Sequence, residues 1–300
     1  MTDDRVQSFL IGDVEVLRIV EWQGPYVPAA TLVPECGPEV WDAHEAQLVP
    51  DHREEGGDRA VVALQTWVLR SGGRTVLVDT GVGDGRERPG NPLFHRRQGD
   101  FLRRLERAGI RPRDVDVVVN THLHADHVGW NTVDAGGEWA PAFPRARYLL
   151  PAADDRHFGP AGGYAGGARP LDRLVYEDSV APVHRAGLAE LWDSTYRIDE
   201  HLVLESAPGH TPGSSVLHVA SRGERAVFVG DLVHSPVQIL RPECNSCFCL
   251  DPAQAARTRW RVLERAAEER ALVVPAHFGG AGAVEVRAAA HGFRLHRWAV

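Results

Sequence analysis

The sequence contains no lysine, because all 33 basic side chains among its 300 residues are arginines. A lysine that forms a Schiff base with a carbonyl substrate is therefore excluded as the catalytic group. The absence of lysine itself fits the coding bias of a GC-rich genome. Long basic runs are also missing and the formal net charge is −8, which argues against a nucleic-acid partner.

Apolar runs of membrane-spanning length are absent as well. No stretch approaches the roughly 20 apolar residues that such a helix needs. The N-terminus, Met1 to Arg5, is acidic and lacks the charged and apolar regions of a signal peptide. We therefore expect a cytoplasmic protein with no membrane partner and with reduced thiols.

Cysteine is scarce, with four in the chain, of which Cys244, Cys247 and Cys249 lie close together. Three thiols are one fewer than an all-cysteine zinc site needs, and Cys36 is remote in the sequence. A structural zinc site is therefore the less favoured interpretation. We expect free thiols in a loop near the rim of an active site.

Short apolar runs recur along the chain and predict a β-rich framework. The expected strands cover residues 8–11, 14–19, 60–69, 74–78, 115–119, 147–150, 201–205, 215–220, 226–229 and 272–274, with a closing hairpin at 285–298 around His291-Gly292. Helical spacing of apolar residues predicts helices at 98–108 and 171–189, the latter with a break near Pro182, and a third that begins at Asp251-Pro252. No linker divides the chain, so we expect a single domain over residues 1–300.

Two segments lack this strand pattern. Residues 22–60 are rich in proline, glycine and charge, and predict a long loop with one helical turn near residues 40–46. Residues 151–200 predict an insertion that is first glycine-rich and then helical. Because long loops are uncommon unless they are functional, we expect both segments to line the substrate pocket.

One short stretch concentrates side chains that bind metals. It directly follows the expected strand at 115–119 and contains His122, His124, Asp126 and His127. Neutral imidazole suits zinc and other late divalent metals, and a carboxylate adds a hard anionic ligand. The alternative is that these histidines have ordinary surface or core roles. That alternative does not explain why only Leu123 and Ala125 separate the four ligand-type residues.

Three further expected strands also end in a ligand-type residue. These residues are Asp79, Asp231 and His277, and His210 lies in a Pro-Gly turn between two strands. This pattern places the candidates along one rim of the framework, with helices outside. Without Asp79 the chain offers seven candidate ligands, too many for one tetrahedral zinc but enough for two metals that share a carboxylate.

The order and spacing of these residues resemble the metallo-β-lactamase-fold hydrolase superfamily. The matching elements are His122-Leu123-His124-Ala125-Asp126-His127, His210-Thr211-Pro212-Gly213, Gly230-Asp231, His277 and, earlier in the chain, Asp79-Thr80-Gly81. The resemblance implies an α+β fold, a four-layer αββα sandwich with a dinuclear site at one edge of the paired sheets. It further implies that one metal is held by His122, His124 and His210, and the other by Asp126, His127 and His277, with Asp231 bridging. Asp79 would hydrogen-bond to a ligand or to the backbone of the site.

The stretch from Gly230 to Gln238 is similar to the branch with methyl parathion hydrolase-like and lactonase-like enzymes. Acyl-homoserine lactonases carry a tyrosine three residues after the bridging aspartate, whereas this chain has His234, which weakens the case for that specificity. His234 is expected to donate to the substrate oxygen or to act as a general acid, with a purely structural role as the alternative. Trp130, three residues after His127, is expected at the rim of the site.

The resemblance therefore implies an enzyme, a dinuclear metal-dependent hydrolase in which a metal-bridging hydroxide attacks an ester or lactone carbonyl. The expected cofactors are two divalent ions, zinc or else manganese or iron, and the expected partner is a small-molecule ester or lactone. The catalytic candidates are Asp126 as a transient proton acceptor, Asp231 as the group that orients the bridge, and His234. Phosphotriesterase activity, an iron-dependent oxygen or redox enzyme, and a non-catalytic scaffold are the alternatives. The oligomeric state is open, with a homodimer as one option.

Overall fold

The computed structural model describes residues 7–162, 170–290 and 292–299. Its contacts divide the chain into two compact units, each of which has its own core. The first unit draws on Met1–Leu10, Val14–Glu21 and Leu64–Asp199, and the second on Ile11–Asp13, Trp22–Ala63 and Glu200–Val300. The division falls within two long strands, so each of these strands contributes to both units.

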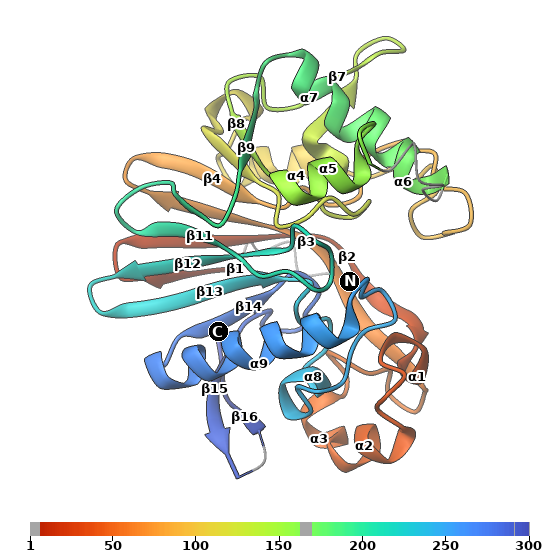
Figure 1. Ribbon diagram of the computed structural model, residues 1–300, viewed down its shortest axis with the longest axis vertical. Helices are drawn as coiled ribbons and strands as arrows, with labels where there is room; N and C mark the ends of the chain where they lie inside the picture. Colours follow the sequence, from red (N-terminus) through yellow and green to blue (C-terminus); the bar gives the residue numbers. More distant parts are fainter. Residues whose placement is uncertain (1–6, 163–169, 291, 300) are drawn as a thin grey trace. The chain divides into compact units, whose positions relative to one another are not determined.

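A mixed sheet carries the first unit, with the strand order β1-β2-β3-β4-β5-β8-β9 (Figure 1). The strands are β1 (Gln7–Ile11), β2 (Val14–Pro28), β3 (Arg59–Ser71), β4 (Arg74–Val78), β5 (Val117–Val119), β8 (Arg147–Pro151) and β9 (Ala189–Trp192). β3 and β4 form an antiparallel hairpin, whereas β4, β5, β8 and β9 run parallel. Parallel neighbours end at the same edge of a sheet, so the residues that follow β4 and β5 lie next to each other.

Short helices pack on this sheet. They are α4 (Phe101–Arg107), η1 (Pro112–Asp114), η2 (Gly129–Asn131), α5 (Ala152–Phe158), α6 (Pro170–Val175), the π-helix η3 (Tyr176–Val180) and α7 (Ala181–Arg185). A small hairpin of β6 (Thr132–Asp134) and β7 (Trp139–Pro141) and the strand β10 (Thr195–Arg197) complete the unit. The core contains Phe101 and Leu105 of α4, Val118 of β5 and Val183 of α7, which are all buried.

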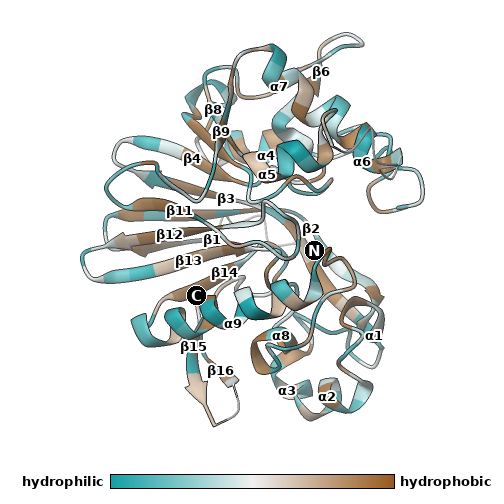
Figure 2. Cartoon of the chain, viewed as in Figure 1, coloured by the Kyte–Doolittle hydropathy of each residue, from teal (hydrophilic) through white to brown (hydrophobic). Residues whose placement is uncertain are grey.

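The other seven-stranded sheet has the order β10-β11-β12-β13-β14-β15-β16, and the second unit contains its strands from β11 onward. They are β11 (Leu202–Ser206), β12 (Ser215–Ser221), β13 (Glu224–Gly230), β14 (Leu272–Pro275), β15 (Val284–Ala289) and β16 (Gly292–Trp298). Only the β13–β14 pair of these neighbours is parallel, because the chain crosses over between them through α9 (Pro252–Glu269). α9 buries Val262, Leu263 and Ala266 in the core of this unit. In Figure 2 the strands are largely brown, whereas α9 shows teal residues on the side in view.

A smaller core in the same unit is formed by four short helices. They are α1 (Ala29–Leu32), α2 (Pro38–Ala43), α3 (Glu45–Leu48) and α8 (Val237–Leu240). Leu32, Trp41 and Leu48 are buried in this core together with Val237. The segment 22–60, which the sequence predicted as a long loop, begins with the end of β2 and then contains α1, α2 and α3. The helical turn predicted near residues 40–46 corresponds to α2 and α3, whereas α1 was not predicted. Helices of four to six residues are too short to produce a sustained apolar period.

The other sequence predictions of regular structure meet mixed outcomes. The predicted hairpin at 8–19 and the strands and helices outside residues 22–60 and 151–200 are confirmed, although His291 lies outside the described residues. The insertion at 151–200 was only partly correct, because β9 is a member of the sheet. The break predicted near Pro182 corresponds to the change from the π-helix η3 to α7. Pro182 sits in the first turn of α7, where a proline needs no hydrogen-bonding N–H. Most of the glycine-rich stretch, residues 163–167, lies outside the described residues.

Among the described helices, none combines the length and the apolar character that a membrane crossing requires.

Candidate metal centre

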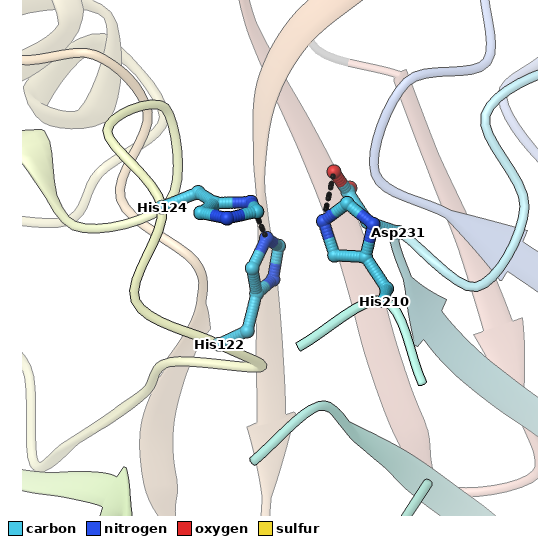
Figure 3. Close-up of side chains that lie close together, drawn as sticks. All are labelled: His122, His124, His210 and Asp231. Carbon is cyan, nitrogen blue, oxygen red and sulfur yellow. Dashed lines mark hydrogen bonds and ion pairs between the residues drawn. The ribbon is translucent and has the colours of Figure 1, made fainter. Parts of the chain in front are cut away.

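The loop after β5 brings its four predicted ligand side chains together in the first unit. His122 Nε2 lies 3.0 Å from His124 Nδ1, and Figure 3 shows the two rings in contact. The centroid of the His127 ring lies 4.0 Å from that of His122, and His127 Nε2 lies 3.8 Å from Asp126 Oδ1. His122 and His127 are buried, whereas His124 and Asp126 are partly exposed. One end of the cluster is therefore fixed in the core and the other is accessible.

Asp79, which follows β4, holds this loop in place. Its Oδ2 accepts a hydrogen bond from His127 Nδ1 at 2.8 Å, and its Oδ1 accepts one from Thr121 N at 2.8 Å. The Thr121 hydroxyl also donates to Asp79 Oδ2 at 2.8 Å. Because the Asp79 carboxylate can only accept, the ring proton of His127 lies on Nδ1. The Nε2 atom therefore keeps the lone pair that a metal needs. The structure thus gives Asp79 the predicted hydrogen bonds to a candidate ligand and to the backbone.

The backbone of Asp79 adopts an unusual conformation, with φ of +58°. Aspartate tolerates this left-handed region better than most residues other than glycine. The conformation costs free energy that the surrounding hydrogen bonds offset, a pattern that is common at functional sites.

Further buried polar groups, which the sequence analysis missed, fix the backbone of the loop. Asn120 Nδ2 donates to the His127 carbonyl at 2.8 Å. The carboxylate of Asp154, which is fully buried at the start of α5, accepts a hydrogen bond from Leu123 N at 3.0 Å. Asn120 immediately precedes the loop and could have been suspected for that reason. Asp154 could not, because only the parallel pairing of β5 with β8 brings it near.

A buried arginine fixes the chain after the loop. Arg86 donates to the carbonyls of Gly129 and Thr132, each at 2.6 Å, and its guanidinium lies 3.7 Å from the centre of the Trp139 ring. Gly129 packs so closely on Val82 that an added Cβ would approach the Val82 carbonyl carbon to 1.9 Å. A larger residue there would therefore push the histidine loop away from the turn after Asp79.

The second unit gathers imidazoles around one carboxylate. Asp231, directly after β13, places its carboxylate oxygens 3.0 Å from His277 Nε2, 3.1 Å from His234 Nε2 and 3.3 Å from His210 Nε2. All four side chains are buried. Figure 3 shows the His210 ring beside the Asp231 carboxylate. Two of these three histidines, His210 and His277, are predicted ligands.

Backbone contacts orient both predicted ligands. His277 Nδ1 lies 2.9 Å from the Ala63 carbonyl, to which it donates, so Nε2 carries the lone pair and is directed at Asp231. His210 follows Gly209, whose φ is +139° and whose Cα lies so near α9 that an added Cβ would approach Ala255 N to 2.3 Å. The His210 backbone is thereby fixed against the start of α9.

His234 belongs to the same cluster, although the sequence did not predict it as a ligand. Asp231, His234 and His277 each offer one ligand atom within 4.8 Å of the other two. The His234 backbone N–H donates to Gln238 Oε1 at 2.8 Å. Its buried Nδ1 has no hydrogen-bond partner among the described residues. The side chain is therefore anchored through its backbone and keeps the ring available for chemistry.

The donor set of both units fits divalent cations. Buried carboxylates and neutral imidazoles are the ligands that zinc and similar ions prefer. The hydrogen bonds of His127 to a carboxylate and of His277 to a backbone carbonyl are those that characteristically orient metal-binding histidines. The complete seven-ligand set and its division between two ions stay predictions.

The other site predictions from the sequence differ in outcome. Cys249 Sγ lies 3.9 Å from His210 Nδ1, which confirms that the cysteine-rich loop is close to the cluster in the second unit. The prediction for Trp130 was wrong, because this residue is buried in the core against Phe101 rather than at a rim. Its indole N–H is satisfied within the core, by Glu21 at 3.0 Å.

Fold and site together define a metal-dependent hydrolase. The sequence matches the metallo-beta-lactamase superfamily over residues 61–277, and the chain belongs to this family. The predicted fold class, an α+β αββα sandwich, is confirmed by this membership and by the solved structures that share the fold.

Three solved structures illustrate the likeness. AidC, a dizinc quorum-quenching lactonase in complex with its product N-hexanoyl-L-homoserine, has 21% identity and a TM-score of 0.79, over 97% of this chain and 96% of its own. The hydrolase AbOPH has 20% identity and a TM-score of 0.78 over the same shares. An N-acyl homoserine lactone hydrolase with N-hexanoyl-L-homoserine at its catalytic metal centre has 15% identity and a TM-score of 0.61, over 91% and 93%.

Asp79 provides a first test of the histidine loop. The substitution Asp79→Asn removes the charge that fixes the proton of His127 on Nδ1, and we expect zinc affinity to fall about 10–100-fold. Titration of the metal-free protein with zinc by calorimetry measures this change. Asp58→Asn, at an exposed aspartate, is the matched control and should leave the affinity unchanged. Equal affinities for all three proteins would contradict the positioning role of Asp79.

Glu21 is a partly buried acid near this loop, and its carboxyl oxygen Oε1 is shielded from solvent. Its Oε2 accepts the hydrogen bond from Trp130. Burial raises the pKa of Glu21 to about 7, although the Trp130 hydrogen bond and the nearby Arg97 lower it. The folded protein therefore binds a proton that the unfolded chain releases at a lower pH.

This raised pKa predicts a loss of stability as the pH rises. Between pH 4.5 and 7 the folded state holds more protons than the unfolded state, so the free energy of unfolding falls through this window. The glutamine side chain of Glu21→Gln does not titrate, so the fall in the free energy of unfolding across this pH range should be about 1–3 kcal/mol smaller in this variant. Urea unfolding at several pH values measures it, with Glu106→Gln at an exposed position as the control. Parallel pH curves for wild type and Glu21→Gln would refute the assignment.

Proposed function

We propose that the protein is a dinuclear metal-dependent hydrolase that opens a lactone or cleaves a related carboxylic ester. The single observation that supports this most is the Asp231 carboxylate, which three imidazole Nε2 atoms surround at 3.0–3.3 Å in a buried setting. A histidine loop of the type found in this family accompanies it in the first unit. The lactonase structures with homoserine products support the substrate class by analogy.

The proposed ligands follow the family pattern. His122, His124 and His210 would hold one divalent ion, Asp126, His127 and His277 the other, and Asp231 would bridge them. Bound there, two such ions, zinc or alternatively manganese or iron, would supply a water of lowered pKa as nucleophile and polarise the substrate carbonyl. Zinc is the first choice because the dinuclear relative of similar fold is a dizinc enzyme.

The chain's own residues would perform the remaining tasks. Asp79 and the Ala63 carbonyl fix the tautomers of His127 and His277, so that their Nε2 atoms act as acceptors. Asp126 is partly exposed and is the carboxylate of the loop that can accept a proton during attack. His234 would donate a proton to the departing alkoxide or a hydrogen bond to the developing oxyanion.

Metal removal and a substrate panel test the proposal. Protein from which a chelator has removed the metal should no longer hydrolyse γ-lactones and aryl esters, and added zinc should restore this activity. Asp231→Asn should lower kcat/KM about 10³-fold or more, because the substitution removes the proposed bridging charge. Inactivity of the zinc- and manganese-loaded protein on the whole ester and lactone panel would overturn the proposal. Faster hydrolysis of a paraoxon-like phosphotriester would favour the phosphotriesterase alternative, and oxygen uptake with bound iron would favour the redox one.

His234 is tested separately. If its ring moves a proton, His234→Gln should lower kcat about 10²-fold or more with a smaller change in KM, and should alter the pH profile of kcat. Metal content, measured on the same samples, should stay at the wild-type value. His296→Gln, at an exposed position on β16, is the matched control. A proportional loss of metal and activity in His234→Gln would show instead that this residue is a ligand.

A further inference from the structure

Two cysteines that the metal centre does not use lie against each other inside the second unit. Cys36, which lies between α1 and α2, and Cys244, which follows α8, are 208 residues apart in the sequence. Their Sγ atoms are 2.7 Å apart, and both are buried as free thiols in the small core that α1–α3 and α8 form.

Hydrogen bonds on either side hold the two segments in register. The Cys247 N–H donates to the Leu32 carbonyl at 2.9 Å. The Asn245 N–H donates to the Glu35 carboxylate. The approach of the two sulfurs is therefore built into the packing of both segments and does not depend on the rotamer of one side chain.

We propose that Cys36 and Cys244 form a reversible dithiol–disulfide pair whose oxidised form ties the α1–α3 segment to the segment after α8. A disulfide requires sulfurs that approach to about 2.05 Å, with Cβ atoms directed toward each other. The thiols of this pair already face each other at 2.7 Å, so a small displacement completes the bond.

The environment of the reduced pair defines which sulfur reacts first. Cys36 donates its S–H to the sulfur of Cys244, and this hydrogen bond lowers the pKa of Cys244. The donor role and burial raise the pKa of Cys36. Cys244 is thus the better nucleophile, since the thiolate is the reactive form.

Hydrogen peroxide can serve as the oxidant that converts the two thiols to the disulfide. The Cys244 thiolate attacks a peroxide oxygen of hydrogen peroxide, which breaks the O–O bond and yields a sulfenic acid and, with one proton, water. The Cys36 sulfur then displaces the sulfenic oxygen, which leaves as a second water with the remaining proton. Two thiols and one hydrogen peroxide give one disulfide and two waters, and the thiols supply both electrons.

One side chain connects this pair to the metal-centre cluster of its unit. Gln238 Nε2 donates to the Cys244 carbonyl at 3.1 Å, and Gln238 Oε1 accepts from the His234 N–H at 2.8 Å. A shift of the Cys244 backbone on oxidation is therefore transmitted to His234 through Gln238.

The decisive experiment uses the full-length double variant Cys247→Ser/Cys249→Ser, in which the proposed pair is the whole thiol content of the chain. After hydrogen peroxide treatment, thiol titration in denaturant should fall from two thiols to none. Mass spectrometry should show the peptide of Cys36 linked to that of Cys244, and dithiothreitol should restore both thiols. Two free thiols after oxidation, or loss of thiols to sulfinic acid without the cross-link, would overturn the proposal.

Thermal unfolding provides an independent readout on the wild type. The oxidised protein should melt roughly 5 °C or more above the reduced protein, because the cross-link closes a long loop. Cys36→Ala should abolish this increase, whereas Cys247→Ser should retain it. Equal melting temperatures for both redox states of the wild type would contradict the proposed tie. Neither readout depends on the hydrolase activity.

Discussion

A buried carboxylate that must be satisfied is the constraint on which each half of the candidate site depends. Taking a carboxylate out of water costs several kcal/mol unless donors or cations surround it. Asp79 in the first unit and Asp231 in the second are both almost fully buried directly after a strand. Asp79 accepts hydrogen bonds from His127 Nδ1 and from the Thr121 N–H, so satisfying this carboxylate also fixes the histidine. Asp231 instead faces the Nε2 atoms of three histidines, and a bound cation would satisfy this arrangement.

The strands explain why these carboxylates meet their partners. β4 and β5 are parallel neighbours in one sheet, and β13 and β14 are parallel neighbours in the other. In each pair the residue after one strand is an aspartate, and the chain that leaves the other strand carries histidines. The hydrophobic burial of the strands therefore supplies the free energy that places the polar groups at the sheet edge.

The sequence predicted the parts of this arrangement that are local or periodic. Strand runs, the start of α9 at Asp251, and the histidine loop after residue 119 were all visible, because each depends on residues that are close in the sequence. Of the helices in residues 29–48, only a turn near residues 40–46 was predicted, since each helix is shorter than the pattern that would reveal it. Trp130 was misplaced because its burial depends on Glu21, over 100 residues earlier, which accepts its N–H. The same division applies within the site. Ligand-type side chains can be recognised by residue type. The groups that orient them, such as the Ala63 carbonyl and Asp154, cannot be recognised in this way.

Preorganisation follows from these contacts. His127 and His277 each take their tautomer from a hydrogen bond within their own unit. The entropic cost of orienting these two rings is therefore met on folding and not on metal binding, which favours binding. His234 differs from them, because its backbone is anchored by Gln238 while its buried Nδ1 has no hydrogen-bond partner among the described residues. A buried ring with one nitrogen free of hydrogen bonds would suit proton transfer, and this difference is the structural reason to propose a separate role for His234.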